Sequence, residues 1–455
     1  MGLLNVVNVA IVNDVNVEEV NQALLQGNLD LPGVFPRLEA LRRSPAVFRV
    51  EFGLDALPAE PGVILIWGAH QYGKSTWLEG ALRDTVVRYG PGSALFLDGD
   101  HLADADSLAR EVSRLALTFS GNVPVRRLFV DEITAVPGWA RALKRVIDRG
   151  ELRDVLIVTT GSHATDLRHG TERLPGRKGK LARSAYLFLP VSYPEFLRVT
   201  DHSLGDSVLP AYLLSGGSPL ACAELVRCGR IPEWVIETTR DWVQGECARA
   251  SRPRRSLVAI MERLHRLGGS AVGQTKLAKE AGLANNTVAA SWIEFLGDLV
   301  CIGVSPAWDS TRQRELPRKP AKYPFVNLLA ATAWAPEAPR SASEFLAMAP
   351  ERQGIWHEWA VAQELHRRAA LAGMSEPDRL PFWQGAGHEI DFVLPDGRFV
   401  EIKRGAATAL DFAWFRRSFP RGELTVVCAT PFSAPGICGE TLHTFLSGNP
   451  TRTGL

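Results

Sequence analysis

An apolar run leads directly into a glycine-containing loop in the first quarter of this chain of 455 residues. The run VILIW (63–67) is typical of a strand buried in a parallel sheet. The loop GAHQYGKST (68–76) has the spacing GxxxxGK[ST], in which glycines let backbone N–H groups face phosphates at the start of a helix. We therefore expect a strand, a phosphate-binding loop and a helix in this order, as in α/β folds.

The loop predicts a nucleotide site. Lys74 is expected to reach the β- and γ-phosphates, and the Ser75 hydroxyl is expected to be a ligand of Mg²⁺. We expect ATP and Mg²⁺ as cofactors, because nothing in the sequence resembles the guanine-reading NKxD element. The expected nucleotide-binding residues are Gly68, Gln71, Tyr72, Gly73, Lys74, Ser75 and Thr76.

Further strands are predicted after the loop, at intervals long enough for crossover helices. The predicted strands are ALFLD (94–98), RLFVDE (127–132), DVLIVTTGS (154–162) and AYLFLP (185–190). Asp131 would hold Mg²⁺ through water, and Glu132 would orient the attacking water, so we expect an ATPase. Thr160 or Ser162 would either contact the γ-phosphate or cap a helix.

A basic loop, TERLPGRKGK (171–180), lies between the last two predicted strands. Arg177 has three interpretations: an arginine finger acting on the nucleotide of a neighbouring subunit, a solvated charge, or a contact to a DNA phosphate. The first interpretation predicts a homo-oligomer.

Composition is that of an ordinary globular protein, with 46% hydrophobic and 22% charged residues. The 51 Lys and Arg nearly balance the 50 Asp and Glu, so a nucleic-acid surface has to be local. Two basic clusters qualify, RASRPRR (249–255) and TRQRELPRKPAK (311–322). The six cysteines lack metal-ligand spacing, which indicates reduced thiols and a cytoplasmic protein. No apolar run is long enough for a bilayer, so no membrane association is expected.

The segment 275–306 has the pattern of a helix-turn-helix. KLAKEA (276–281) predicts a first helix, Asn285 and Asn286 the turn and cap, and TVAASWIEFLGDLV (287–300) a second helix with an apolar face. The following run, VCIGVSPAW (300–308), is the expected strand of a wing. Winged helices bind DNA or pack against protein, and the flanking basic clusters favour DNA.

GHEIDFVLPDGRFVEIKRG (387–405) predicts two short strands joined by a tight turn. A two-residue turn would leave Asp391 and Glu401 on opposite faces. The three-residue loop PDG (395–397) fits better, because proline suits the first position of a type I turn and glycine the left-handed closing position. In that register Asp391 faces Glu401 on the side that carries Lys403. Facing carboxylates repel, so Lys403 and a divalent cation are expected to compensate.

The helix IWHEWAVAQELHRR (355–368) supplies a further acid. Glu358 lies on an apolar stripe, where a carboxylate is costly unless it is paired or metal-bound, whereas Glu364 shares a face with polar residues. Glu358 with Asp391, Glu401 and Lys403 resembles the site of PD-(D/E)XK nucleases, which implies Mg²⁺ on Asp391 and Glu401 and a lysine that activates water. The alternatives are a solvated face with a Glu401–Lys403 pair, or a nuclease fold without activity.

Taken in order, GAHQYGKST, FVDEITAVPGW, VTTGSHA, LPGRKGK, LSGGSP, KYPFVN and GHEIDFVL resemble a group of prokaryotic AAA-type ATPases. That group fuses an ATPase to a winged helix and to a C-terminal region similar to Holliday-junction resolvases. The resemblance supports the nucleotide and hydrolysis roles above, and Gly176–Arg177 matches the group's GR element. We therefore expect an N-terminal extension (1–40), a P-loop AAA-type α/β domain (41–200), a helical and winged-helix domain (201–335) and a restriction-endonuclease-like α/β domain (336–455).

Two functions follow from these patterns. The first is an ATP-dependent remodelling of, or translocation on, duplex or branched DNA by a homo-oligomer, with Mg²⁺-dependent cleavage left open. The second is a nucleotide-dependent regulatory switch whose winged helix and C-terminal domain bind proteins and no nucleic acid.

Overall fold

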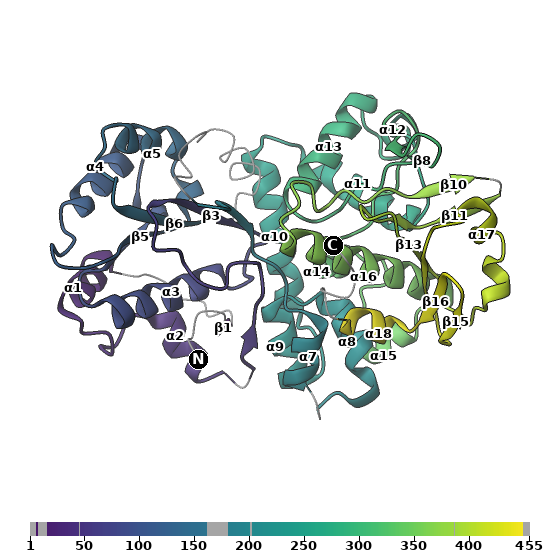
Figure 1. The fold of residues 1–455 in the computed structure, drawn as a ribbon, viewed down its shortest axis with the longest axis horizontal. Coiled ribbons are helices and arrows are strands. Elements are labelled where there is room, and N and C mark those ends of the chain that lie inside the picture. The colour runs from purple at the N-terminus through teal and green to yellow at the C-terminus, as the bar shows by residue number, and fades with distance from the viewer. Residues whose placement is uncertain are drawn as a thin grey trace. The chain divides into compact units, whose positions relative to one another are not determined.

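The computed structural model describes residues 6–7, 16–44, 46–161, 181–200, 203–385 and 387–448. They fall into two compact units, Met1–Val191 and Ser192–Leu455 (Figure 1). Within these described ranges, no helix combines the length and the apolar character that a membrane span requires.

A five-stranded parallel sheet forms the centre of the first unit, with the strand order β4-β5-β6-β3-β7. All five predicted strands are present, so the expected parallel α/β core is confirmed. β3 lies between β6 and β7, and the loop that follows it therefore leaves from the interior of the sheet. The strands of this unit are β1 (Val6–Val7), β2 (Phe48–Arg49), β3 (Gly62–Trp67), β4 (Ala94–Asp98), β5 (Arg126–Asp131), β6 (Val155–Gly161) and β7 (Ala185–Leu187).

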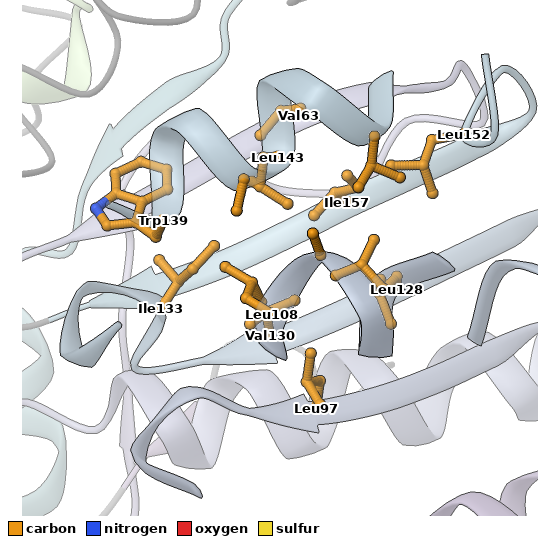
Figure 2. Packing of buried hydrophobic residues seen from close by; sticks show 14 of the residues in the cluster. Val63, Leu97, Leu108, Leu128, Val130, Ile133, Trp139, Leu143, Leu152 and Ile157 are labelled. Carbon is orange, nitrogen blue, oxygen red and sulfur yellow. The ribbon is translucent and has the colours of Figure 1, made fainter. Parts of the chain in front are cut away.

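Helices cover both faces of the sheet (Figure 1). On one face, α4 and α5 enclose a cluster of buried side chains that includes Leu97, Leu108 and Leu143 (Figure 2). α3, which follows the loop, packs against β4, β5 and β6 from the other face. Burial on both faces explains why the strands are nearly continuous apolar runs in the sequence. The helices are α1 (Val17–Gln26), α2 (Pro36–Arg42), α3 (Lys74–Tyr89), α4 (Ala105–Ala116) and α5 (Trp139–Asp148), with 3-10 turns η2 (Gly99–His101) and η3 (Ile133–Ala135).

The segment that precedes β3 packs on the same sheet. α1 lies against the edge strand β4, and the buried side chain of Asn21 pairs with both backbone groups of Phe96. Asn21 Nδ2 donates to Phe96 O at 2.8 Å, and Phe96 N donates to Asn21 Oδ1 at 2.7 Å. The amide thus takes the place of a neighbouring strand and protects an exposed sheet edge.

The second unit is mainly helical in its first half. α13 begins after Asn285, whose Oδ1 accepts a hydrogen bond from Val288 N at 3.0 Å, and α12 packs beside it, so both predicted helices are present. The helices are α7 (Tyr193–Thr200), α8 (Val208–Ser215), α9 (Pro219–Cys228), α10 (Glu233–Arg249), α11 (Arg254–Leu267), α12 (Gln274–Glu280), α13 (Asn286–Asp298), α14 (Leu328–Ala333), α15 (Ala342–Leu346), α16 (Pro350–Leu371), α17 (Phe415–Ser418) and α18 (Leu442–Ser447), with 3-10 turns η4 (Gly205–Ser207) and η5 (Ala409–Phe412).

A mixed sheet forms the second half of this unit, with the order β12-β13-β14-β16-β15. β13, β14 and β16 are parallel to one another, and β12 and β15 pair antiparallel at the two edges. The strands are β8 (Trp308–Asp309), β9 (Arg314–Glu315), β10 (Trp383–Gly385), β11 (His388–Ile390), β12 (Phe392–Val393), β13 (Phe399–Ile402), β14 (Leu424–Val427), β15 (Phe432–Ala434) and β16 (Ile437–Glu440).

The expected wing strand over 300–308 is not one regular strand. Ile302 and Ser305 form single bridges to residues 325 and 322, while Val304 and Ala307 bridge to residues 379 and 382. The regular hairpin, β8 with β9, begins only at Trp308. Pro306 cannot donate to a ladder, and the run contacts a different segment on each side, so no continuous pairing forms.

Candidate functional site

The phosphate-binding loop is built by backbone conformations that the sequence pattern anticipates. Gly73 and Gln71 have positive φ of 93° and 59°, which curls the chain between β3 and α3. A Cβ added to Gly68 would lie 2.7 Å from Phe188 O, so only glycine fits at the first position. Lys74 is 4% exposed, and its Nζ donates to Gly68 O at 3.1 Å and to Ala69 O at 2.9 Å. The loop thus holds its lysine against its own backbone.

Asp131 lies at the carboxyl end of β5, beside this loop. Its Oδ1 accepts hydrogen bonds from Ser75 Oγ at 3.1 Å and from Thr160 Oγ1. Burial raises the pKa of the Asp131 carboxyl, and these hydroxyls act against the shift. Since Thr160 belongs to β6, its hydroxyl does not cap a helix. ATP and Mg²⁺ fit this arrangement: the curled loop can hold phosphates, and Ser75 with Asp131 can hold the metal ion, which would neutralise phosphate charge.

Ser162 and Arg177 lie outside the described residues, so their expected roles stay predictions. Gln71, Tyr72 and Thr76 belong to the loop and to the first turn of α3, as expected from the motif.

Four predicted side chains come together in the second unit. Glu358 on α16, Asp391 between β11 and β12, Glu401 in β13 and Lys403 line one pocket of about 840 Å³. Asp391 N donates to Glu401 Oε2 at 3.2 Å, and Lys403 Nζ donates to Glu401 Oε1. Pairing of residues 392 and 393 with 400 and 399 confirms the three-residue hairpin loop.

Lys322 is the residue of this pocket that sequence reasoning missed. We counted it in a basic surface cluster, but its side chain is 2% exposed, and its Nζ lies 2.6 Å from Glu389 Oε1 and 2.8 Å from Asp391 Oδ1. Glu358 Oε1 is 3.7 Å away. The available signal was its position in AKYPFVN, where a lysine adjoins an apolar run. We call Lys322, Glu358, Glu389, Asp391, Glu401 and Lys403 the acid–lysine cluster.

Charge in the acid–lysine cluster is unbalanced, because four carboxyl groups face two ammonium groups. Burial raises the pKa of Glu401 to about 8 and that of Glu358 to about 7, and the nearby Asp391 adds to both shifts. Burial alone would lower the pKa of Lys322, but Asp391, Glu358 and Glu389 outweigh burial and raise it. The cluster therefore retains its lysine charges, and Glu358 and Glu401 take up protons near neutral pH.

Mg²⁺ does not fit the acid–lysine cluster as it stands. Within the described part of the chain, no group of three or more His, Cys, Asp and Glu side chains is arranged to hold a metal ion. Lys322 Nζ lies between the carboxylates of Asp391 and Glu389, in the space that a shared cation would take. The expected ligands Asp391 and Glu401 meet, but a lysine lies among the acids.

Glu364 corrects the expectation for α16. It is 2% exposed, not solvated, and accepts hydrogen bonds from Arg367 Nε at 2.8 Å and Arg368 Nε at 2.7 Å. Burial would raise the pKa of Glu364, but the two guanidinium groups lower it. Residues 361–370 are buried all around the helix, so the stripe pattern did not identify the most buried acid.

Residues 60–197 match the model of a family described as an AAA domain. They form an AAA-family ATPase domain. None of the curated proteins matches this sequence. Solved structures with some similarity include a Walker-type ATPase of Pyrococcus abyssi, with 15% identity, a TM-score of 0.40, and 70% of this chain and 96% of that chain covered. A RuvB variant of Thermotoga maritima has 14% identity, a TM-score of 0.30 and coverages of 54% and 82%. The ORC2 protein of Aeropyrum pernix has 12% identity and a TM-score of 0.35, with 61% of this chain and 87% of that chain covered.

A charged network links the AAA domain to α2, which precedes the matched residues. Glu79 on α3 is buried, and its carboxylate accepts hydrogen bonds from Arg37 N at 3.0 Å and Leu38 N at 3.1 Å. Arg37 Nη1 donates to Glu79 Oε1 at 3.0 Å. Burial raises the pKa of Glu79 to about 7, against the effect of Arg37. Sequence reasoning missed both residues, although an acid inside the apolar stretch TWLEGAL was a usable signal for Glu79.

Glu132 of the AAA domain has a strained backbone. Its φ of 42° and ψ of 45° are left-handed, which is uncommon for a residue with a side chain. Its N–H points to Thr160 Oγ1 and Asp131 Oδ1, both at 3.2 Å. A Cβ added to Gly99, at the end of the neighbouring strand, would overlap the Glu132 carbonyl oxygen. Gly99 thus makes room for the conformation of Glu132.

Each basic cluster has a member that packs within the protein, Arg252 half-buried and Lys322 buried. Arg252 lies over the Trp292 ring, 5.0 Å from its centroid, and donates to Ser291 Oγ at 2.8 Å, while Lys322 is buried as described. An exposed group remains near α12, because Val272 pairs with Ala321 and brings the two segments together. We call the exposed residues Lys276, Lys279, Arg318 and Lys319 the basic surface.

Proposed function

We propose that this protein is a Mg²⁺-dependent ATPase that acts on duplex or branched DNA and works as a homo-oligomer. The observation that carries the ATPase part is the position of Asp131, which lies beside the phosphate-binding loop and accepts from Ser75. This is the relationship that a P-loop ATPase needs between its metal-binding hydroxyl and carboxylate.

In this proposal, each predicted site residue of the AAA domain has a role in hydrolysis. Backbone N–H groups of the loop bind the phosphates, and Lys74 contacts the β- and γ-phosphates. Ser75 and Asp131 hold Mg²⁺. Glu132 orients the attacking water. Its backbone N–H donates to Thr160 Oγ1 and Asp131 Oδ1, which holds Glu132 at the end of β5. Arg177 would act on the nucleotide of a neighbouring subunit.

The basic surface and the adjoining helices support DNA as the partner. α12 and α13 pack against each other, as a helix-turn-helix would, and the β8–β9 hairpin that follows would serve as a short wing. Lys276 and Lys279 on α12 are exposed together with Arg318 and Lys319. Such contacts to phosphates give affinity that falls steeply with salt.

The C-terminal part of the proposal is a nuclease-like domain. Its support is the meeting of Glu358, Asp391, Glu401 and Lys403 beside the mixed sheet. This arrangement supports a domain that contacts DNA phosphates, and the presence of Lys322 bears on whether it cleaves them.

DNA binding can be tested at the basic surface. Fluorescence anisotropy with a labelled duplex should show weaker binding and a smaller salt slope for K276A/K279A than for wild type. The exposed Lys144 on α5 of the other unit offers a matched control, K144A, which should bind like wild type. Equal affinity and an equal salt slope in all three proteins would show that this surface does not contact DNA.

A second candidate function is a nucleotide-dependent switch that binds proteins. It is favoured by α13, which carries no Lys or Arg between Asn286 and Asp298 and exposes Glu294 instead. A helix that reads a major groove usually contributes several basic or amide side chains to it, and α13 offers Asn286 alone. A switch would hydrolyse ATP at a rate that DNA does not change.

A further inference from the structure

We infer that Lys322 is a built-in counter-ion that holds the nuclease-like carboxylates together in place of a divalent metal ion. The inference depends on the side-chain positions of the acid–lysine cluster in the second unit and not on ATP hydrolysis. The cluster would then differ from metal-dependent nucleases in one specific way, because a lysine ammonium group would lie where they hold a metal ion.

The lysine is fixed from several sides. Its backbone pairs with Ser305 in both directions, since Ser305 N donates to Lys322 O at 2.9 Å and Lys322 N donates to Ser305 O at 2.9 Å. The Phe382 ring lies 5.4 Å from Nζ. With 2% exposure, the side chain is almost fully enclosed by the protein. Lys322 is therefore part of the interior and not of the basic surface.

The ammonium group uses the oxygens that a metal ion would need. Glu389 and Asp391 are 2.6 and 2.8 Å from Nζ, and Glu358 is 3.7 Å away. Mg²⁺ would require oxygens at about 2.0–2.1 Å in near-octahedral geometry, which places it in the same space as the ammonium. Two cations in that space would also repel each other. Lys322 and a metal ion are thus mutually exclusive at Asp391.

Two neighbouring features adjust the acids to the lysine. A Cβ added to Gly269 would overlap the Glu358 carboxylate, so glycine at this position lets Glu358 lie close to the backbone. Ile402 N donates to Asp391 Oδ2 at 2.9 Å, which leaves Oδ1 to Lys322. Each oxygen of Asp391 therefore has a donor from the protein itself.

The consequence is a nuclease-like domain that keeps its shape without metal. Phosphodiester cleavage by a metal-activated water has no support at this site while Lys322 is in place. Lys403, half exposed beside Glu401, is the cation of the cluster that can contact a ligand from solvent.

Mn²⁺ binding to the full-length chain without nucleotide tests the inference, measured by the loss of the free Mn²⁺ electron paramagnetic resonance signal. The control K319Q changes an exposed lysine of the same sequence run. Any Mn²⁺ that wild type or K319Q binds should remain when Asp391→Asn is added, because it is bound elsewhere. K322Q should gain one Mn²⁺ per chain, and K322Q/D391N should lose that site again. The Asp391→Asn comparison separates this site from Mn²⁺ bound at the nucleotide loop.

Thermal unfolding supplies a second measurement, because K322Q leaves buried carboxylates without their cation. We expect K322Q to unfold at a lower temperature than wild type and to recover with added Mn²⁺, while the wild-type midpoint stays unchanged. If K322Q does not fold, K322Q/E389Q removes one of the uncompensated acids. It should still gain a Mn²⁺ site, with lower affinity because one candidate ligand is lost.

Two results would overturn the inference. One is a wild-type chain that binds Mn²⁺ with an affinity similar to K322Q and loses it in D391N, because Lys322 would then yield to metal. The other is a folded K322Q or K322Q/E389Q protein that gains no Mn²⁺, because the acids would then not be arranged for a metal even without the lysine. The Asp391→Asn comparison in the wild-type background decides the first result whether or not the Lys322 variants fold.

Discussion

Arg37 Nη2 lies 3.7 Å from Asp131 Oδ2, while Nη1 of the same guanidinium donates to Glu79 at 3.0 Å. A residue outside the matched AAA region thus joins the carboxylate proposed to hold Mg²⁺ to the helix that follows the phosphate-binding loop. The N-terminal segment therefore contributes to the nucleotide site.

Replacing Arg37 by alanine should lower both stability and the rate of ATP hydrolysis. Glu79 would keep two backbone donors but lose its cation, at a cost of about 1–3 kcal/mol in the free energy of unfolding. The loss should be larger above pH 7 than below it, because the pKa of Glu79 is about 7 and a protonated carboxyl needs no cation. Denaturant unfolding at both pH values measures it.

The control for this change is R42A on the same helix, where the side chain is exposed and little change is expected. R37K should restore most of the stability but less of kcat, because an ammonium group cannot reach Glu79 and Asp131 together. If R37A hydrolyses ATP with wild-type kcat and KM, Arg37 has no positioning role.

Gly99→Ala should impair hydrolysis while nucleotide binding is retained. The added methyl group would overlap the Glu132 carbonyl oxygen and displace the residue expected to orient water. We predict a fall in kcat of about 10²-fold with little change in the Kd for ATP, measured by steady-state kinetics and by nucleotide titration. Gly121 has open space within 4 Å of an added Cβ, so G121A should behave like wild type. A G99A protein with normal kcat would contradict the role of Glu132 or of its backbone position.

Stability should fall as the pH rises from 6.5 to about 8. The folded state binds protons on Glu401 and Glu358, whose pKa values are about 8 and 7, more tightly than the unfolded chain, in which the usual value is 4.5. Stability that such raised pKa values provide is lost as the pH passes through them, by up to about 1.4 kcal/mol per pH unit and proton. His265 and His357 have pKa values lowered from 6.5 to about 4. They make stability rise with pH only below 6.5, so they do not offset the fall above it.

Glu401→Gln should flatten this pH dependence, because it removes the carboxyl with the higher of the two pKa values. The denaturant midpoint measured across the same pH range reports the slope. Glu423→Gln, at an exposed position, serves as the control and should leave the slope unchanged. A slope in E401Q that equals that of wild type would show that Glu401 does not bind the proton.

The strands and motifs of the AAA domain could be predicted because their signals are local. A buried parallel strand needs a continuous apolar run, and a phosphate-binding loop needs glycines at fixed spacing, as at Gly68 and Gly73. The hairpin register was also predictable, since the loop PDG fixed which residues pair. Each of these features is decided by residues close together in the sequence.

Arg37, Glu79 and Lys322 could not be placed in the same way. Lys322 meets Asp391 across 69 positions of sequence, and Arg37 meets Glu79 across 42. A lysine beside other basic residues suggests a solvated surface, and only the packed structure shows that this one is interior. Glu364 shows the same limit, because helical periodicity cannot identify the buried acid of a helix that is buried on all sides.

Arg177 should act between subunits if it is an arginine finger. R177A is expected to bind ATP normally and to hydrolyse it poorly. K74A is expected to be inactive for a different reason, because its own phosphate-binding loop is impaired. Mixing the two inactive proteins should restore part of the activity, because some interfaces then combine an intact loop with an intact finger. Mixtures as inactive as their components would place Arg177 outside a shared active site.

The ATP hydrolysis rate in the presence of single-stranded, duplex and four-way junction DNA tests the proposed function most directly. We predict that duplex or junction DNA raises the rate, that the increase disappears as salt is raised, and that K74A lacks both basal and stimulated hydrolysis. A rate that none of the three DNAs changes at any salt concentration, with K74A still inactive, would contradict action on DNA and leave a nucleotide-dependent switch. Hydrolysis by K74A at the wild-type rate would contradict the nucleotide site itself.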